Sequence, residues 1–239
     1  MLPATWCIDA LALASVGARA ASELTVQLTT EASRPGEWQS FIYGDCGLPQ
    51  LHTLLCVLER HCGLVLEGKA FVDLGHGTGE LALSAALLRK WGSVRGVEAC
   101  AQRFGESERL LARWHMQVAP TLPRDQQRLE VVVQLLHGNM LDLRALDWSS
   151  ADVVYVHATC FNESLIASLT ELAGCLKPGA HVVSVGKSLV SDRLQHLFAW
   201  GCEMSYSDGA KCPVFISRRR RDASRFALPS HTYQLSSLT

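Results

Sequence analysis

Ten residues set the architecture expected of this chain: Phe71-Val-Asp73-Leu-Gly75-His-Gly77-Thr-Gly79-Glu80. A short apolar run ends here at three alternate glycines, and an Ala- and Leu-rich run over residues 80–91 follows them. Glycine adopts the left-handed backbone conformations that a sharp turn needs, and it lets the backbone approach a ligand closely. The pattern therefore predicts a strand, a tight loop and a helix whose first N–H groups are free to bind a ligand.

Short apolar runs and helical patterns alternate on both sides of this loop. Such alternation is typical of parallel β-α-β units, which build an open α/β sheet with helices on both faces. The chain then ends with two short runs that predict an antiparallel hairpin at the edge of the sheet. We expect strands at 70–74, 93–98, 129–136, 151–156, 180–185, 202–206 and 213–217, and helices at 3–28, 49–62, 80–91, 100–118 and 163–175.

The composition fits one globular domain. Of the 239 residues, 48% are hydrophobic and 19% are charged, which is not the composition of a disordered chain. The formal net charge of −1 creates no overall field that would attract a polyanion, so contact with a nucleic acid needs a local basic patch. No apolar run reaches the roughly 20 residues that span a bilayer. The start of the chain lacks a basic n-region, which argues against a signal peptide.

The cysteine pattern argues against both a disulfide framework and a metal site. The nine cysteines are scattered and contain no Cys-x-x-Cys pair, which indicates reduced thiols in an intracellular compartment. The set nearest to a metal site consists of His52, Cys56, His61 and Cys62. We interpret this set as a core-facing thiol beside surface histidines, and no metal is expected there.

The ligand of the glycine loop is expected to be a nucleoside. Glu98 stands at the end of the next strand, about 20 residues beyond the glycines, where an acidic side chain accepts hydrogen bonds from ribose hydroxyls. A dinucleotide-binding loop has the spacing Gly-x-Gly-x-x-Gly. Here the third glycine comes one residue early, and Asp73 starts the pattern. The alternative is a glycine loop that only makes a strand-to-helix turn.

Asp-x-Gly-x-Gly-x-Gly resembles the first motif of the class I methyltransferases. The resemblance implies a Rossmann-like, mostly parallel sheet and S-adenosylmethionine as the cofactor. Asp73 would face the cationic amino-acid end of the cofactor, and Gly75, Gly77 and Gly79 would form the loop around it.

The segment after the third strand contains Gly138, Asn139 and Met140. At this position class I methyltransferases usually place a polar side chain on the adenine amino group and an apolar one on the adenine ring. Asn139 and Met140 fit these two roles. An ordinary Gly-Asn turn is the alternative interpretation.

The loop after the fourth strand begins at His157 and is expected beside the glycine loop. A histidine there is able to orient a substrate or to remove its proton, because its unperturbed pKa lies near working pH. The alternative is a histidine that only satisfies backbone groups at the end of the strand. Cys160 is a weaker candidate for a nucleophile, because no base can be named for it.

Four blocks together resemble the non-SET histone-lysine methyltransferases, the disruptor-of-telomeric-silencing class, and in particular its short kinetoplastid-like members. The similarity extends over roughly residues 40–217. It implies that Tyr43, Gly44 and Asp45 close over the cofactor and that Phe161 and Tyr206 line a lysine channel. It also implies that the catalytic set consists of Tyr43, Asp45, His157, Phe161 and Tyr206. The blocks are Tyr43-Gly44-Asp45, 71–79, Asp152–Phe161 and Leu176–Ser184.

Two positions depart from the family pattern. His157 stands where the family usually has asparagine, and Ala158 stands where it has a second polar residue. The resemblance implies a methyl transfer to a lysine amine of a core histone in the nucleosome. The departures keep two alternatives open: a methyltransferase with a small-molecule or other substrate, and a module that binds the cofactor without catalysis.

A basic run near the end of the chain is a candidate for contact with nucleosomal DNA. It is followed by a polar stretch, and its alternatives are a solvated tail or a nuclear import signal. With a histone substrate, a nuclear location is expected. The expected organisation is a helical segment at 1–40, a methyltransferase domain at 41–217 and a basic, polar tail at 218–239. The run consists of Arg218, Arg219, Arg220 and Arg221.

Overall fold

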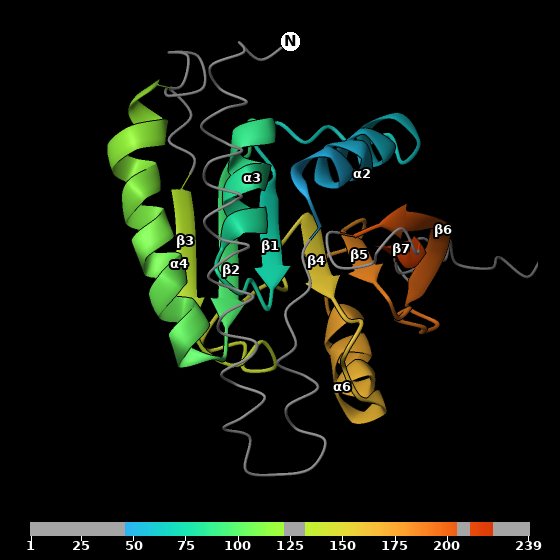
Figure 1. The fold of residues 1–239 in the computed structure, drawn as a ribbon. Coiled ribbons are helices and arrows are strands. Elements are labelled where there is room, and N and C mark those ends of the chain that lie inside the picture. The colour runs from blue at the N-terminus through green and yellow to red at the C-terminus, as the bar shows by residue number, and fades with distance from the viewer. Residues whose placement is uncertain (1–45, 122–131, 205–210, 222–239) are drawn as a thin grey trace, which may run out of the picture.

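The computed structural model describes residues 46–121, 132–204 and 211–221. Within these ranges seven strands form one sheet, and helices pack against it (Figure 1). The strand order is β3-β2-β1-β4-β5-β7-β6. The first five strands pair in parallel, and β7 pairs antiparallel with both β5 and β6. The strands are β1 (Ala70–Leu74), β2 (Ser93–Glu98), β3 (Val132–His137), β4 (Val153–His157), β5 (His181–Val185), β6 (Leu194–Glu203) and β7 (Lys211–Arg219).

This topology confirms the mostly parallel sheet with an antiparallel hairpin at one end. The predicted helices within the described ranges also form, although three of them end two or three residues early. The first helix after the glycine loop ends where the backbone of Arg89 becomes extended, with a φ of −144° and a ψ of 154°. The Ala85 carbonyl near this end accepts the Trp91 indole N–H at 2.9 Å as well as the Arg89 N–H. The helices are α2 (Leu48–Arg60), α3 (Glu80–Leu88), α4 (Ala101–Arg113, continued by a π turn at Trp114–Val118 and a 3-10 turn at Ala119–Thr121) and α6 (Glu163–Ala173).

Each strand sends alternate side chains to the two faces of the sheet. Phe71 of β1 and Tyr155 of β4 belong to a buried cluster with residues of α2, α3 and α4. Their neighbours Val72 and Val154 belong to a second cluster with residues of α6. Both faces of the central strands are therefore covered, as the mostly apolar sequences of β1 and β4 predict.

The hairpin differs from the expectation. β6 begins at Leu194 rather than at residue 202, and the register shifts between His196 and Phe198. Such a bulge breaks the two-residue alternation by which a strand is recognised in a sequence. β7 also continues to Arg219, two residues beyond its predicted end.

Several expectations fall outside the described residues. They are the helix at 3–28, the loop with Tyr43, Gly44 and Asp45, the start of the third strand at 129–131, and Tyr206. Among the helices that are described, none is long and apolar enough to cross a membrane.

Candidate functional site

Parallel pairing brings the predicted segments to one edge of the sheet. Leu74, the last residue of β1, is in register with both Val97 of β2 and Val156 of β4. The glycine loop, Glu98 and His157 therefore follow one another at adjacent strand ends. The Gly138 N–H donates to the Glu98 carbonyl at 2.9 Å, which places the segment after β3 beside them. In open α/β sheets, ligands bind outside the carboxyl ends of the strands, which is this edge.

The backbone of the loop requires its glycines. The φ angles of Gly75, Gly77 and Gly79 are 81°, 56° and 83°, in the left-handed region that other residues adopt at a cost. Gly79 is also short of space, because an added Cβ would lie 2.6 Å from Cδ1 of Leu135 and 3.3 Å from Cβ of Ser107. Close packing of α3 against the neighbouring elements thus depends on Gly79.

We expect Gly79→Ala to lower the free energy of unfolding by about 2–4 kcal/mol, since backbone strain and overpacking add. Gly63→Ala is the matched control, because Gly63 has a φ of 67° but no atom within 4 Å of its added Cβ. In the control, the free energy of unfolding is expected to fall only by the cost of the backbone strain, about 1–2 kcal/mol. Urea unfolding measures both, and equal losses would contradict the packing assigned to Gly79.

Glu98 is held in one orientation by the backbone. Its side chain is 5% exposed. Oε2 accepts the Gly77 N–H at 2.9 Å, and Oε1 accepts the Cys100 N–H at 2.8 Å. A carboxylate has about four acceptor positions, so each oxygen retains one for the hydrogen-bond donors of a ligand. Asp73, the acidic residue that starts the glycine motif, lies on the adjacent strand β1 and is also buried.

The segment after β3 is compatible both with an ordinary turn and with an adenine-binding segment. The Asn139 side-chain oxygen accepts the Leu141 N–H at 2.9 Å, so Asn139 does close a turn. The Met140 methyl group lies 3.4 Å from the position of a Cβ on Gly75, so Met140 borders the glycine loop. The adenine contacts of both residues stay predictions.

His157 ends β4 with its imidazole largely removed from water. The Tyr155 hydroxyl lies 3.3 Å from Nδ1. Burial lowers the pKa of His157 to about 4, which leaves the ring neutral at neutral pH. A neutral imidazole offers one acceptor and one donor nitrogen, whereas a base with so low a pKa takes a proton from an amine poorly.

The loop beyond His157 is fixed against β5 and α6. The Ala158 N–H donates to the Val185 carbonyl at 2.8 Å, and the Asn162 side chain caps α6 through the Leu165 N–H at 2.9 Å. Phe161 is 8% exposed and belongs to the buried cluster on the α6 face. Burial raises the pKa of the Cys160 thiol, which further weakens its case as a nucleophile.

His76, inside the glycine loop, was not singled out from the sequence. Its ring packs over Gly96 of β2, where a Cβ would lie 2.8 Å from the imidazole Cδ2. A lone glycine within a strand often marks a close approach of this kind, so Gly96 was the signal.

The four arginines of the basic run differ in their exposure to solvent. Arg219 is 8% exposed, and its Nε donates to the Gly174 carbonyl at 2.7 Å, so the expectation was wrong for this residue. The Arg218 guanidinium donates to Gln195 at 2.8 Å, whereas Arg220 and Arg221 are exposed. Because β7 runs antiparallel to β5, this end of β7 lies at the edge of the sheet opposite the glycine loop.

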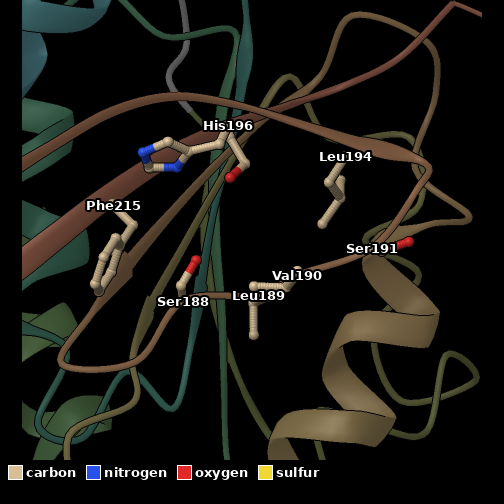
Figure 2. Close-up of a pocket in the computed structure, with 8 residues that line it drawn as sticks. Ser188, Leu189, Val190, Ser191, Leu194, His196 and Phe215 are labelled. Atoms are coloured by element: carbon tan, nitrogen blue, oxygen red, sulfur yellow. The ribbon is translucent and has the colours of Figure 1, made fainter.

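A separate cavity of about 240 Å³ lies between the loop after β5 and the outer strands (Figure 2). It contains none of the predicted site residues. Ser188, Leu189, Val190, Ser191, Leu194, His196, Phe215 and Ser217 line it.

The remaining candidates are the metal-binding set and the cysteine thiols. Within the described part of the chain, no three His, Cys, Asp or Glu residues are grouped so that they could hold a metal ion. The eight cysteines in those ranges are reduced thiols. Cys56, from the set considered for metal binding, instead accepts a hydrogen bond from Arg89 at 3.4 Å.

Known structures share this fold. The crystal structure of TrmN from Thermus thermophilus matches with a TM-score of 0.55 and 16% identity, over 76% of this chain and 51% of that one. This chain thus spans about half the length of TrmN. The putative methyltransferase yhhF from Escherichia coli matches with a TM-score of 0.52 and 14% identity, over 72% of this chain and 86% of that one. At such identities the likeness shows a methyltransferase fold alone.

Sequence comparison places the chain more narrowly. No curated protein matches it. The family model described as "Histone methylation protein DOT1" matches residues 34–200, which include the glycine loop, Glu98 and His157. Since that match covers more than half of the 239 residues, the chain belongs to the DOT1 family of histone methylation proteins.

Proposed function

We propose that this protein transfers a methyl group from S-adenosylmethionine to a lysine amine of a core histone in the nucleosome. The observation that carries the proposal is the meeting of the glycine loop, Glu98 and His157 at one sheet edge in a member of the DOT1 family. When bound, S-adenosylmethionine supplies an electrophilic sulfonium methyl group. A nuclear location follows from a histone substrate.

The residues at the edge fit this cofactor. Glu98 presents two further acceptor positions, which match the two hydroxyls of a ribose. Met140 borders the glycine loop and offers an apolar surface for adenine. The Asn139 side-chain oxygen accepts one N–H and has a second acceptor position for the adenine amino group. Asp73 faces the amino-acid end. We assign the closing loop to Tyr43, Gly44 and Asp45 from the family resemblance alone.

The acceptor amine must be neutral before it attacks the methyl group. Apolar surroundings disfavour the charged form of an amine, and we propose that Phe161 and Tyr206 provide them. The neutral imidazole of His157 orients the amine through its acceptor nitrogen. In this role His157 replaces the asparagine amide that the family usually has.

The His157 departure also supports a second candidate, a methyltransferase that acts on a small molecule. A cofactor-binding module without catalysis is the third. The three differ in where label from the cofactor's methyl group appears: in a core histone, in a metabolite, or in neither.

We propose that Arg220 and Arg221, the exposed residues of the basic run, contact phosphates of nucleosomal DNA. A solvated tail or a nuclear import signal is the alternative. Replacing both arginines by alanine is expected to lower the salt dependence of nucleosome binding by up to about 2 in the log–log slope, because each neutralised phosphate releases about 0.9 counterions. Cofactor affinity is expected to stay unchanged. Binding titrations between low and moderate salt measure the slope.

The control for this prediction is Arg60→Ala combined with Arg109→Ala, which removes the same charge from α2 and α4. An equal flattening in the control would show that overall charge, and not this end of β7, governs binding. Arg219→Ala is not a suitable variant, because it removes a hydrogen bond to Gly174 from a buried position.

A further inference from the structure

The imidazole of His76 is enclosed within the glycine loop and makes one side-chain hydrogen bond there. Its side chain is 3% exposed, and Nδ1 lies 2.9 Å from the carbonyl oxygen of Gly77. Because a carbonyl only accepts, Nδ1 carries the hydrogen and donates it. Nε2 is then the unprotonated nitrogen, and it has no hydrogen-bond partner in the described ranges.

The imidazole of His76 packs between β2 and α4. Gly96 of β2 is beneath it, so close that a Cβ would come within 2.8 Å of Cδ2 and 2.9 Å of the His76 Cβ. Phe104 of α4 is on another side, with its ring centroid 6.4 Å from that of the imidazole. The ring is therefore fixed between β2 and α4.

The peptide groups on both sides of Gly77 are engaged. Its carbonyl accepts from His76, and its N–H donates to Oε2 of Glu98 at 2.9 Å. Gly77 has a φ of 56° and no side chain, so its orientation depends on these two bonds together with the Gly79 N–H, which donates to the His76 carbonyl at 2.8 Å. A chain of contacts runs from His76 through Gly77 to the carboxylate of Glu98.

Packing alone does not explain an imidazole at this position. A buried polar nitrogen without a partner carries a desolvation cost that a leucine of similar volume would avoid. Burial lowers the pKa of His76, although the nearby Glu98 carboxylate opposes this, and the ring is neutral at neutral pH. The donated bond to Gly77 is the contribution that leucine lacks.

We infer that His76 is a positioning residue: by holding the Gly77 carbonyl, it fixes the Gly77 N–H and thereby the Glu98 carboxylate that receives the ribose of the cofactor. The inference rests on the proposed function for its ligand, whereas the restraint on Gly77 does not depend on any ligand.

The first test compares His76→Asn with His76→Leu. Asparagine retains an N–H donor near the position of Nδ1, and leucine retains only volume. His76→Leu is expected to weaken binding of S-adenosylmethionine about three- to tenfold in calorimetry, while His76→Asn stays near wild type. Equal affinities for the two variants, with equal thermal unfolding of the free proteins, would overturn the inference.

The second test displaces the imidazole without altering it. Gly96→Ala places a methyl group against the ring and is expected to weaken cofactor binding in the wild-type background. In a His76→Ala background the same methyl has room, so it is expected to have little further effect. Gly105→Ala, with nothing within 4 Å of the added Cβ, is the control. Additive effects of the two substitutions would mean that Gly96 does not act through His76.

The third test needs no cofactor. Native-state hydrogen exchange of the Gly77 amide, followed by NMR, is expected to accelerate about three- to tenfold in His76→Leu and to stay unchanged in His76→Asn. If the wild-type protein fails to bind S-adenosylmethionine, the proposed function fails and exchange still decides the role of His76. An unchanged exchange rate in His76→Leu would overturn the inference by itself.

Discussion

Replacing Glu98 by alanine is expected to weaken binding of S-adenosylmethionine about ten- to a hundredfold, since a hydrogen bond to a charged group contributes about 1.5–3 kcal/mol. The variant loses the acceptors proposed for the ribose, and it also frees the N–H groups of Gly77 and Cys100. Glu98→Gln keeps one acceptor oxygen and is expected to fall between alanine and wild type. Calorimetric titration gives the three affinities.

The control for Glu98 is Glu163→Ala, which removes a carboxylate that is 87% exposed and paired with Lys187. It is expected to bind the cofactor as wild type does. Unchanged affinity in Glu98→Ala would contradict the ribose assignment. Tighter binding of a nicotinamide dinucleotide than of S-adenosylmethionine by the wild-type protein would overturn the cofactor class.

Replacing His157 by alanine is expected to lower turnover about ten- to a hundredfold, because an oriented amine reacts faster than a loosely held one. Cofactor affinity is expected to change little, since the interaction belongs to the transition state. His157→Asn is expected to keep most of the turnover, because an amide can orient the amine as the neutral imidazole does. Steady-state rates on the true acceptor, with cofactor titrations of each variant, measure these effects.

The pH profile separates the two roles considered for His157. With a pKa of about 4, the ring does not change charge between pH 5 and 8, so the wild-type rate is expected to show no limb that His157→Asn removes. Between about pH 6.5 and 4 the unfolded chain protonates this histidine and the folded protein does not, so acidification through this window lowers stability. A limb near pH 6.5 that disappears in His157→Asn would support the base role instead.

His181 provides a matched control for these measurements. Its pKa is also lowered to about 4 by burial, but it begins β5 and lies at the edge opposite the glycine loop. His181→Asn is expected to change acid stability without changing the pH profile of turnover. If His157→Ala keeps a wild-type rate, His157 only ends its strand, and the catalytic residues must be sought near Tyr43 and Asp45.

Features set by local requirements were predictable from the sequence. The glycine loop follows from backbone conformations that glycine alone adopts readily. The strands β1 and β2 have their predicted bounds. The arrangement of Glu98 and His157 beside the loop follows from parallel pairing, which brings the carboxyl ends of strands to one edge.

Features set by distant contacts were not predictable. The bulge near His196 hid the start of β6 because it broke the alternation of side chains. Arg219 reads as part of a charged tail, yet pairing of β7 with its neighbours buries it against Gly174. The fit of His76 over Gly96 depends on a contact between the glycine loop and β2, which a pattern along the chain does not show.

The central claim is tested most directly by transfer of a radiolabelled methyl group from S-adenosylmethionine, with the full-length protein offered nucleosomes, free core histones and a metabolite extract in parallel. We expect label in a lysine of a core histone, with nucleosomes as the preferred acceptor and with transfer strongly reduced in Glu98→Ala. Label in a metabolite but not in histones would contradict the histone assignment. Binding of the cofactor with no label in any acceptor would contradict catalysis.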